Sequence, residues 1–263
     1  MKVRGLLLLP FLFFAVGGVF GQEIEIIETR DLELATDGID TLEIHCDSTD
    51  VGIAAVEGLG KVSVSAYINI RGRDQARVEE IAAEGILLDL SRRGNRGVLT
   101  CRVESTFFLM RLIRGEEKRV QLDIRIPAQM NLDINIEDGK LSVSRLSGNC
   151  TVTSGQGDCI LEGITGKVGV VDDGGNLRLS NVNGEILIED GPGDVEIGTS
   201  GGSLNLVDTS GDVDIRDFSG PVHIEDSGGS LTVTDLEGDL KIRARGRGDV
   251  KLSGVTGTII QNY

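Results

Sequence analysis

From Leu132 to the end of the chain, apolar and polar residues follow a nine-residue period. The first and third positions of each unit are apolar in nearly every case, and the second is usually polar. This alternation predicts one short strand with one buried face in each unit. The eighth position is glycine in every nonapeptide, and the one ten-residue unit shifts it to Gly248. A glycine at a fixed place predicts a corner that needs a positive φ or a close backbone approach.

The units alternate in kind, so the full repeat consists of two units. Odd units often carry an acidic corner, as at 137–139, 172–174 and 189–191. We therefore expect one corner to be solvent-exposed and charged, and the other to turn an apolar side chain inward. Two strands and two unlike corners form one coil, and stacked coils with parallel backbone hydrogen bonds form a β-solenoid. The apolar residues at the sixth position of even units are Leu146, Ile164, Val182, Phe218, Leu236 and Val255.

The alternative fold is an antiparallel meander with tight turns. Asp138–Gly139 and Asp190–Gly191 are dipeptides that hairpin turns favour. The 18-residue alternation of corners is better explained by every second strand stacking in register. The predicted fold class is therefore all-β, a parallel β-solenoid with 18-residue coils preceded by a less regular, β-rich region with one short helix.

The chain divides into a predicted signal peptide at 1–21, an N-terminal region at 22–131 and the repeat solenoid at 132–263. The N-terminal region is expected to cap or continue the solenoid, because a solenoid end exposes unpaired strand edges. A helix is predicted near 73–84, where helix-favouring residues are frequent. Strands are predicted at 41–46, 61–70, 97–104 and 119–127.

The segment 1–21 has the organisation of a secretory signal. Lys2 and Arg4 precede an apolar run over 6–16, and cleavage is expected near Gly21–Gln22, with a retained N-terminal anchor as the alternative. No later run approaches the roughly 18 apolar residues of a membrane helix, so no stable membrane span is expected after signal removal. The formal net charge of −16 disfavours nucleic-acid binding. We expect export to the periplasm or the cell surface.

The most apolar stretch after the predicted signal is STFFLMRLIR at 105–114. It is expected either to contact a membrane or partner, or to form a strand pair or a cap over the first coil. The cap or strand pair is the favoured interpretation. The apolar residues of this stretch are Phe107, Phe108, Leu109, Met110, Leu112 and Ile113.

The four cysteines are Cys46, Cys101, Cys150 and Cys159. An exported chain with an even number of cysteines permits disulfides, and four cysteines allow three pairings. Pairing by proximity, Cys46 with Cys101 and Cys150 with Cys159, is favoured, and four small buried thiols are the alternative.

The fifth position of successive odd units is aspartate at Asp172, Asp190, Asp208 and Asp226. In stacked coils these residues would form a ladder with a spacing of ~4.8 Å. Neighbouring charges at that spacing repel by about 3.5 kcal/mol at an effective dielectric constant of 20. Water at an exposed corner, turn N–H groups or bound cations such as calcium could relieve this repulsion. Structural turn-capping is favoured, and the four residues are the candidate cation ligands.

No catalytic residue is predicted. The glycines at 191–198 are not followed by the helix that a phosphate-binding loop needs. His45 falls in a predicted strand, where packing is expected, and His223 falls at an outward position. The predicted function is a non-catalytic, adhesin-like or envelope-associated module that contacts a protein or glycan, with assembly through coil ends as a further option. The alternative is a polysaccharide-binding or polysaccharide-modifying β-helix protein, since long β-helices host glycan-cleaving enzymes with paired carboxylates.

The order of segments also resembles a known family. IDTLEIHCDSTDVGIAA is followed by RGRDQARVEEIAAEGI, and VQLDIRIPAQMNLDINIEDGK then leads into the repeats. This order, over roughly residues 40–260, resembles the bacterial DUF4097 family, which is related to a family named for proposed auto-transporter adhesin head domains. The resemblance implies a β-solenoid and an envelope or surface location. It supplies no catalytic residues.

Overall fold

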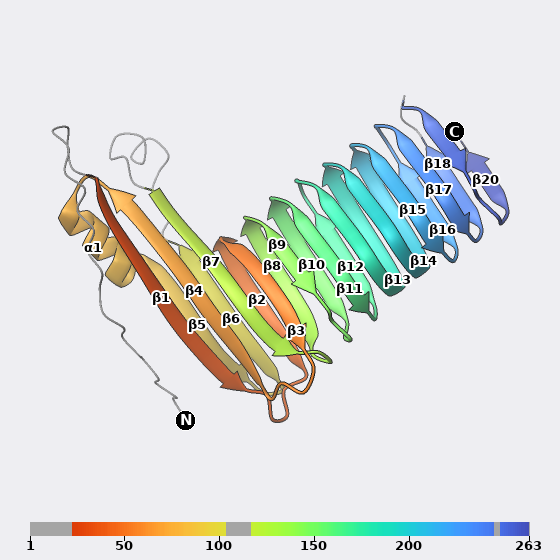
Figure 1. Ribbon diagram of the computed structural model, residues 1–263. Helices are drawn as coiled ribbons and strands as arrows, with labels where there is room; N and C mark the ends of the chain where they lie inside the picture. The colour runs from red at the N-terminus through yellow and green to blue at the C-terminus, as the bar shows by residue number, and fades with distance from the viewer. Residues whose placement is uncertain (1–22, 104–116, 245–247, 263) are drawn as a thin grey trace.

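The protein is an elongated rod of parallel β-structure with an antiparallel region and a helix at its N-terminal end (Figure 1). The computed structural model describes residues 23–103, 117–244 and 248–262. The solenoid has about seven turns of about 18 residues, which confirms the predicted fold class. Its strands are β2 (Thr41–Ser48), β3 (Asp50–Val56), β8 (Asn131–Asp138), β9 (Leu141–Ser144), β10 (Cys150–Gln156), β11 (Cys159–Thr165), β12 (Val168–Asp172), β13 (Leu177–Pro192), β14 (Val195–Ser210), β15 (Val213–Ser219), β16 (Val222–Asp226), β17 (Leu231–Glu237), β18 (Leu240–Ala244), β19 (Val250–Ser253) and β20 (Ile259–Asn262).

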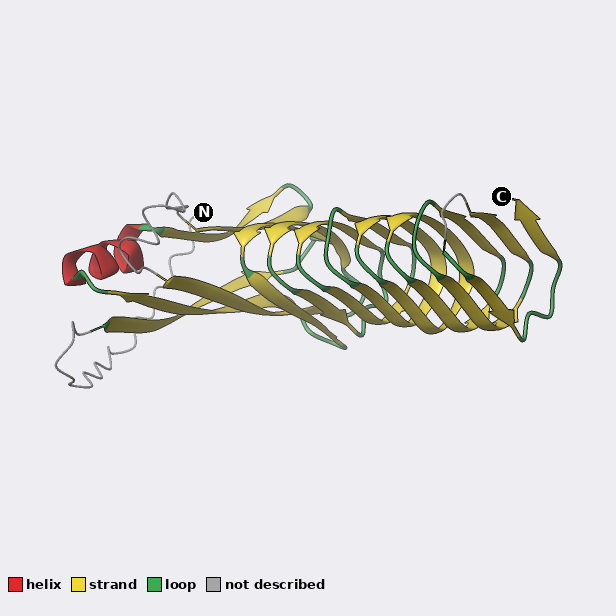
Figure 2. Ribbon diagram, turned by 90° about the horizontal axis from the view of Figure 1, so that it is seen from above, coloured by secondary structure: helices red, strands yellow, loops and turns green. Residues whose placement is uncertain are grey.

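The strands form two facing sheets, which Figure 2 shows as the two long sides of the rod. The β2 sheet runs through β2, β8, β10, β12, β16, β18 and β20, and the β3 sheet through β3, β9, β11, β15, β17 and β19, while β13 and β14 each bend around a corner and serve both. The register advances by one full coil from each strand to the next, as in the pairs Cys150–Val168 and Leu177–Val195. Parallel pairing in this register excludes the antiparallel meander for the repeat region.

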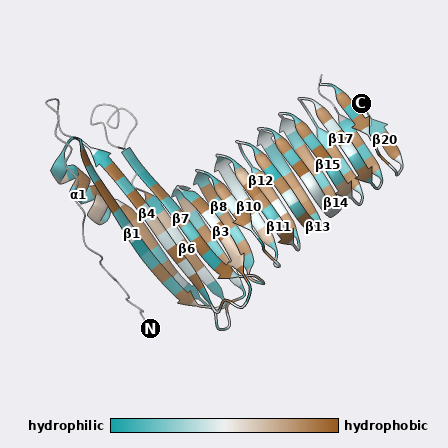
Figure 3. Ribbon diagram, in the orientation of Figure 1, coloured by the Kyte–Doolittle hydropathy of each residue, from teal (hydrophilic) through white to brown (hydrophobic). Residues whose placement is uncertain are grey.

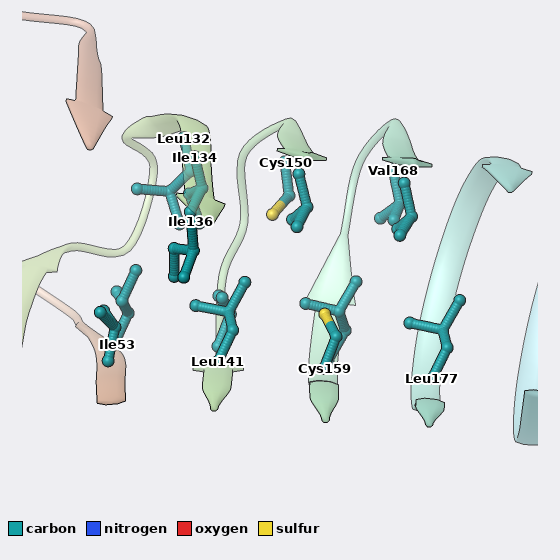
Figure 4. Close-up of a cluster of buried hydrophobic side chains, with 14 of the residues drawn as sticks. Ile53, Leu132, Ile134, Ile136, Leu141, Cys150, Cys159, Val168 and Leu177 are labelled. Carbon is teal, nitrogen blue, oxygen red and sulfur yellow. The ribbon is translucent and has the colours of Figure 1, made fainter. Parts of the chain in front are cut away.

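The core lies between the two sheets, in columns of stacked apolar side chains. Successive side chains of a strand point to opposite faces, so the first and third positions of each unit point inward. Brown and teal alternate along each strand in Figure 3, as this arrangement requires. Figure 4 shows two such columns, one with Leu132, Cys150 and Val168 and the other with Leu141, Cys159 and Leu177.

Two spines of glycine close the corners of the solenoid. Gly211 has φ +136°, and a Cβ there would overlap the carbonyl oxygen of Gly193 in the preceding coil. Gly202 is similar in the other spine, where a Cβ would overlap the carbonyl oxygen of Gly184. Both reasons predicted for the eighth-position glycine, positive φ and close backbone approach, therefore hold at these corners.

The even corners reverse direction through a residue in the left-handed conformation. Thr199 has φ +46° and Asp217 has φ +52°, each at the fifth position of an even unit. The turn brings the sixth-position side chain inward, so that Phe218 is fully buried. The predicted inward apolar corner is confirmed.

The first coil of the solenoid, β2 and β3, is separated from the next coil by a long excursion. Strand β1, which precedes this coil, and the strands of the excursion continue the sheets as antiparallel pairs, β1 with β4 and β4 with β7 on one side and β5 with β6 on the other. Helix α1 packs its Val78, Ile81 and Ala82 against them, and the Asp74 carboxylate caps its N-terminus. The four strands and the helix predicted for this region are confirmed. Their bounds are β1 (Ile24–Ala35), β4 (Lys61–Gly72), α1 (Gln75–Glu84), β5 (Ile86–Arg93), β6 (Arg96–Val103) and β7 (Glu117–Pro127).

Two predicted segments lie outside the described residues. They are the signal peptide at 1–21 and the whole apolar stretch at 105–114, including all six of its candidate contact residues. In the part of the chain that is described, no helix is long and apolar enough to cross a membrane.

Candidate functional site: a buried aspartate column

The four aspartates at the odd corners form a column inside the solenoid. Parallel register places Asp172 beside Asp190, Asp190 beside Asp208, and Asp208 beside Asp226. The exposed fractions of Asp172, Asp190, Asp208 and Asp226 are only 1%, 4%, 0% and 3%, in that order. The prediction of a solvent-exposed, charged corner is therefore wrong for these side chains. The reason is the strand alternation itself, which puts the fifth position on the same inward face as the first and third.

The column is short of hydrogen-bond donors. The backbone N–H of Gly174 donates to Asp172 Oδ1 at 3.1 Å, and that of Gly228 donates to Asp226 Oδ1 at 2.8 Å. Among the described residues, no partner is found for Asp172 Oδ2, Asp190 Oδ2 or either carboxyl oxygen of Asp208. Turn-capping, the favoured role, therefore holds at the two ends of the column but not at Asp208.

Burial raises the pKa of three of the four carboxyls, those of Asp172, Asp190 and Asp208. Desolvation is the main cause at Asp172 and Asp190, where the pKa rises to about 6. At Asp208 the same desolvation acts together with the charges of Asp190 and Asp226 and raises the pKa to about 8. A carboxylate cannot donate a hydrogen bond, whereas a protonated Asp208 can donate to a neighbouring aspartate. Asp208, whose pKa lies above 7, is thus the member of the column that holds a proton at neutral pH.

A bound cation remains the other way to neutralise the column. Within the described ranges, no group of three or more His, Cys, Asp or Glu side chains is arranged to hold a metal ion. Calcium takes six to eight oxygen ligands, many more than two stacked carboxylates supply. The calcium hypothesis predicts that calcium raises the melting temperature and that Asp190→Asn weakens this effect. An unchanged melting temperature in calcium would exclude it.

All four cysteines are buried free thiols. Cys46 and Cys101 are register partners on β2 and β6, in the same sheet as the aspartate column. Cys150 and Cys159, in contrast, belong to the two different side-chain columns of Figure 4. Desolvation raises the pKa of Cys150 to about 12 and also raises that of Cys159, which makes both thiols unreactive.

A groove lies near the C-terminal end of the rod, where strands β16, β18 and β20 of the β2 sheet begin. Its volume is about 440 Å³, and its lining includes Pro221, His223, Lys241 and Ile260. Nε2 of His223 lies 3.5 Å from Glu225 Oε1, while its Nδ1 is buried without a hydrogen-bond partner. His45 is exposed on β2, so the packing role expected for it is wrong. The two histidines lie on different coils, and nothing described places them in one site.

A second ladder, which the sequence interpretation missed, runs along the corners at the ninth position. Oδ1 of Asp194 accepts from the backbone N–H of Asp212 at 2.9 Å, and Oδ1 of Asp212 accepts from that of Ser230 at 2.8 Å. Asn176 joins the same ladder through the N–H of Asp194 at 3.1 Å. The recurring Asp or Asn after the eighth-position glycine was its available signal. These side chains satisfy corner N–H groups and are structural.

The fold and the column define a repeat protein, a parallel β-solenoid with minimal corners and a polar interior stripe. The sequence profile of the DUF4097 family, described as Toastrack, matches residues 39–259. The chain therefore belongs to this family. No curated protein shows significant sequence similarity to it.

Several solved structures are similar to the chain in fold. A proposed cell-adhesion protein from Clostridium sporogenes is 8% identical, with 90% of this chain and 100% of that chain covered and a TM-score of 0.33. A proposed adhesin from Parabacteroides distasonis is 12% identical, with 89% and 97% covered and a TM-score of 0.39. A proposed lipid-binding protein from the same species is 12% identical, with 90% and 97% covered and a TM-score of 0.29.

Proposed function

We propose that the protein is an exported, non-catalytic β-solenoid that acts as an adhesin-like or envelope-associated interaction module. The observation that carries this proposal is the closeness of the corners. At Gly193, Gly211 and Gly229 in turn, the backbone of one coil lies so near the next that a Cβ would not fit. Enzymes on β-helices build their clefts from loops that protrude from the coils. Tight glycine corners leave flat outer sheet faces, which suit contact with an extended partner. The basic and apolar pattern of segment 1–21 supports export.

Sugar recognition by stacking finds little support on the solenoid faces. Between 132 and 262 the sequence has one aromatic residue, Phe218, and its side chain is 1% exposed. Glycan binders usually place aromatic rings against sugar faces. A partner that contacts polar and aliphatic side chains fits the described faces better, and the groove beside His223 and Lys241 is the first place to test.

The test is a binding measurement with the full chain. Immobilised protein would be exposed to envelope fractions, protein and glycan, and to a glycan array, with release of reducing sugar ends followed in parallel. We expect saturable binding to an envelope component without sugar release. Lys241→Glu should weaken binding at least several-fold if the groove takes part. Lys251→Glu is the matched control, because Lys251 is an exposed lysine at the equivalent position of the β3 sheet. Sugar release would contradict the non-catalytic proposal.

A further inference from the structure

Cys46 and Cys101 lie side by side where the antiparallel cap meets the solenoid. They are directly paired in the register of the parallel strands β2 and β6, and their exposed fractions are 2% and 0%. Neighbouring strands lie ~4.8 Å apart, which is within the Cα separation of about 4.4–6.8 Å that disulfides adopt. Thr49 Oγ1 lies 3.6 Å from Cys101 Sγ, so the hydroxyl approaches the thiol pair inside the core.

We propose that Cys46 and Cys101 form a disulfide when the chain folds in the presence of a disulfide donor, while Cys150 and Cys159 remain thiols. The proposal rests on the proposed function in one respect, since export is what would bring the folding chain to such a donor. The geometry of the pair is independent of export. It ties β6, the cap strand that borders the solenoid in this sheet, to β2, the first strand of the solenoid.

The chemistry is thiol–disulfide exchange. One cysteine loses its proton, and its thiolate attacks the donor disulfide to form a mixed disulfide and release one donor thiol. The second cysteine, also deprotonated, attacks the mixed disulfide and releases the second donor thiol. The two cysteine sulfurs together lose two electrons, the donor gains them, and the two protons pass to the released thiolates. Because both sulfurs are buried in the folded protein, the exchange takes place before β2 and β6 close over them.

Cys150 and Cys159 provide an internal comparison. Cys150 is flanked in its sheet by Leu132 and Val168, and Cys159 is flanked by Leu141 and Leu177 (Figure 4). Neither has a cysteine as its register partner. The pairing predicted from the sequence joins Cys150 to Cys159 as well as Cys46 to Cys101, whereas the register joins only Cys46 to Cys101.

The bond is tested by counting thiols in the full chain. Protein refolded in a mixture of oxidised and reduced glutathione would be denatured, alkylated and weighed by mass spectrometry, and its peptides mapped. We expect two alkylated thiols, at Cys150 and Cys159, and one linked peptide pair containing Cys46 and Cys101. Four alkylated thiols, or a Cys150–Cys159 link, would overturn the proposal. This measurement on the unmutated chain does not depend on whether any variant folds.

Thermal melts give a second, functional readout. The bond would close a loop of more than fifty residues, so its reduction is expected to lower the melting temperature by about 10 °C. Cys46→Ala should abolish the response to reductant, and the matched variant Cys150→Ala should keep it. If reductant does not change the melting temperature of the refolded chain, the proposed stabilising disulfide is contradicted. Since refolding needs no export, cell fractionation tests export separately, and failure of either proposal is recognised on its own.

Discussion

Asp208 combines complete burial with two carboxyl oxygens that have no partner among the described residues. Its raised pKa, about 8 against 3.8, means that the folded protein holds a proton that the unfolded chain releases. The unfolded state then binds fewer protons than the folded state between about pH 4 and 8. Stability therefore falls as the pH rises through this window, by up to about 1.4 kcal/mol per pH unit for one such proton.

The Asp208→Asn variant tests this sign. An amide keeps the shape of the carboxyl but carries no charge, so we expect the variant to be more stable than the native protein at pH 8 and its stability to change less between pH 5 and 8. Urea unfolding at the two pH values measures both effects. Asp212→Asn is the control, because Asp212 is exposed and an amide oxygen can still accept from Ser230. A native protein that gains stability from pH 5 to 8 would contradict the proton-holding column.

Thr199 carries backbone strain at an even corner. Its φ of +46° is costly for a β-branched residue, and Gly163 and Gly254 occupy the equivalent place in other coils with φ +66°. We expect Thr199→Gly to stabilise the protein by about 1 kcal/mol, because glycine adopts this conformation without the steric cost. Thr232→Gly, within strand β17, should destabilise it instead. The urea midpoints of the two variants measure these changes in stability. Equal destabilisation by both substitutions would contradict the claim that Thr199 is strained.

At the scale of the coil, the glycine spines set the spacing between turns. In Gly211→Ala, the new methyl group would overlap the carbonyl of Gly193, so neighbouring coils must move apart or the corner must unfold. We expect a loss of about 3 kcal/mol or more. Gly169→Ala is the matched control, since a Cβ there meets nothing within 4 Å and should change stability by less than about 1 kcal/mol. Thermal melts followed by circular dichroism measure the stability of both variants. Equal melting temperatures would contradict the claim that the glycine spine sets the spacing between coils.

Most of the solenoid could be predicted from the sequence alone. The nine-residue period was enough to predict the strands, corners and coils, because each coil repeats the same local chemistry. If the alternation of inward and outward positions is continued to the fifth position, it also places Asp190 and Asp208 inside. Their charge instead favoured the prediction that they face solvent. The pairing of β2 with β8 could not be predicted, because the excursion after β3 separates these strands by more than eighty residues. No feature of the sequence within Thr41–Ser48 indicates that β8 is its partner.

At the scale of the whole molecule, the solenoid is a nearly one-dimensional stack in which each coil contacts only its neighbours. In the described part of the chain, β19 and β20 pair only with β17 and β18, and Ile259 and Ile260 are 46% and 51% exposed. Coils at this end therefore have fewer stabilising neighbours than β13 and β14 in the middle.

Hydrogen exchange of the full chain should show this difference. We expect amides of β19 and β20 to exchange faster than those of β13 and β14, because local opening costs least where only one neighbouring coil must be released. If coil ends also associate, protection of β20 and the mass from light scattering should rise together with protein concentration. Ile260→Lys would then remove the concentration dependence by placing a charge on the exposed apolar edge. Uniform protection along the rod at low concentration would contradict the one-dimensional account, and a strict monomer at every concentration would exclude assembly through this end.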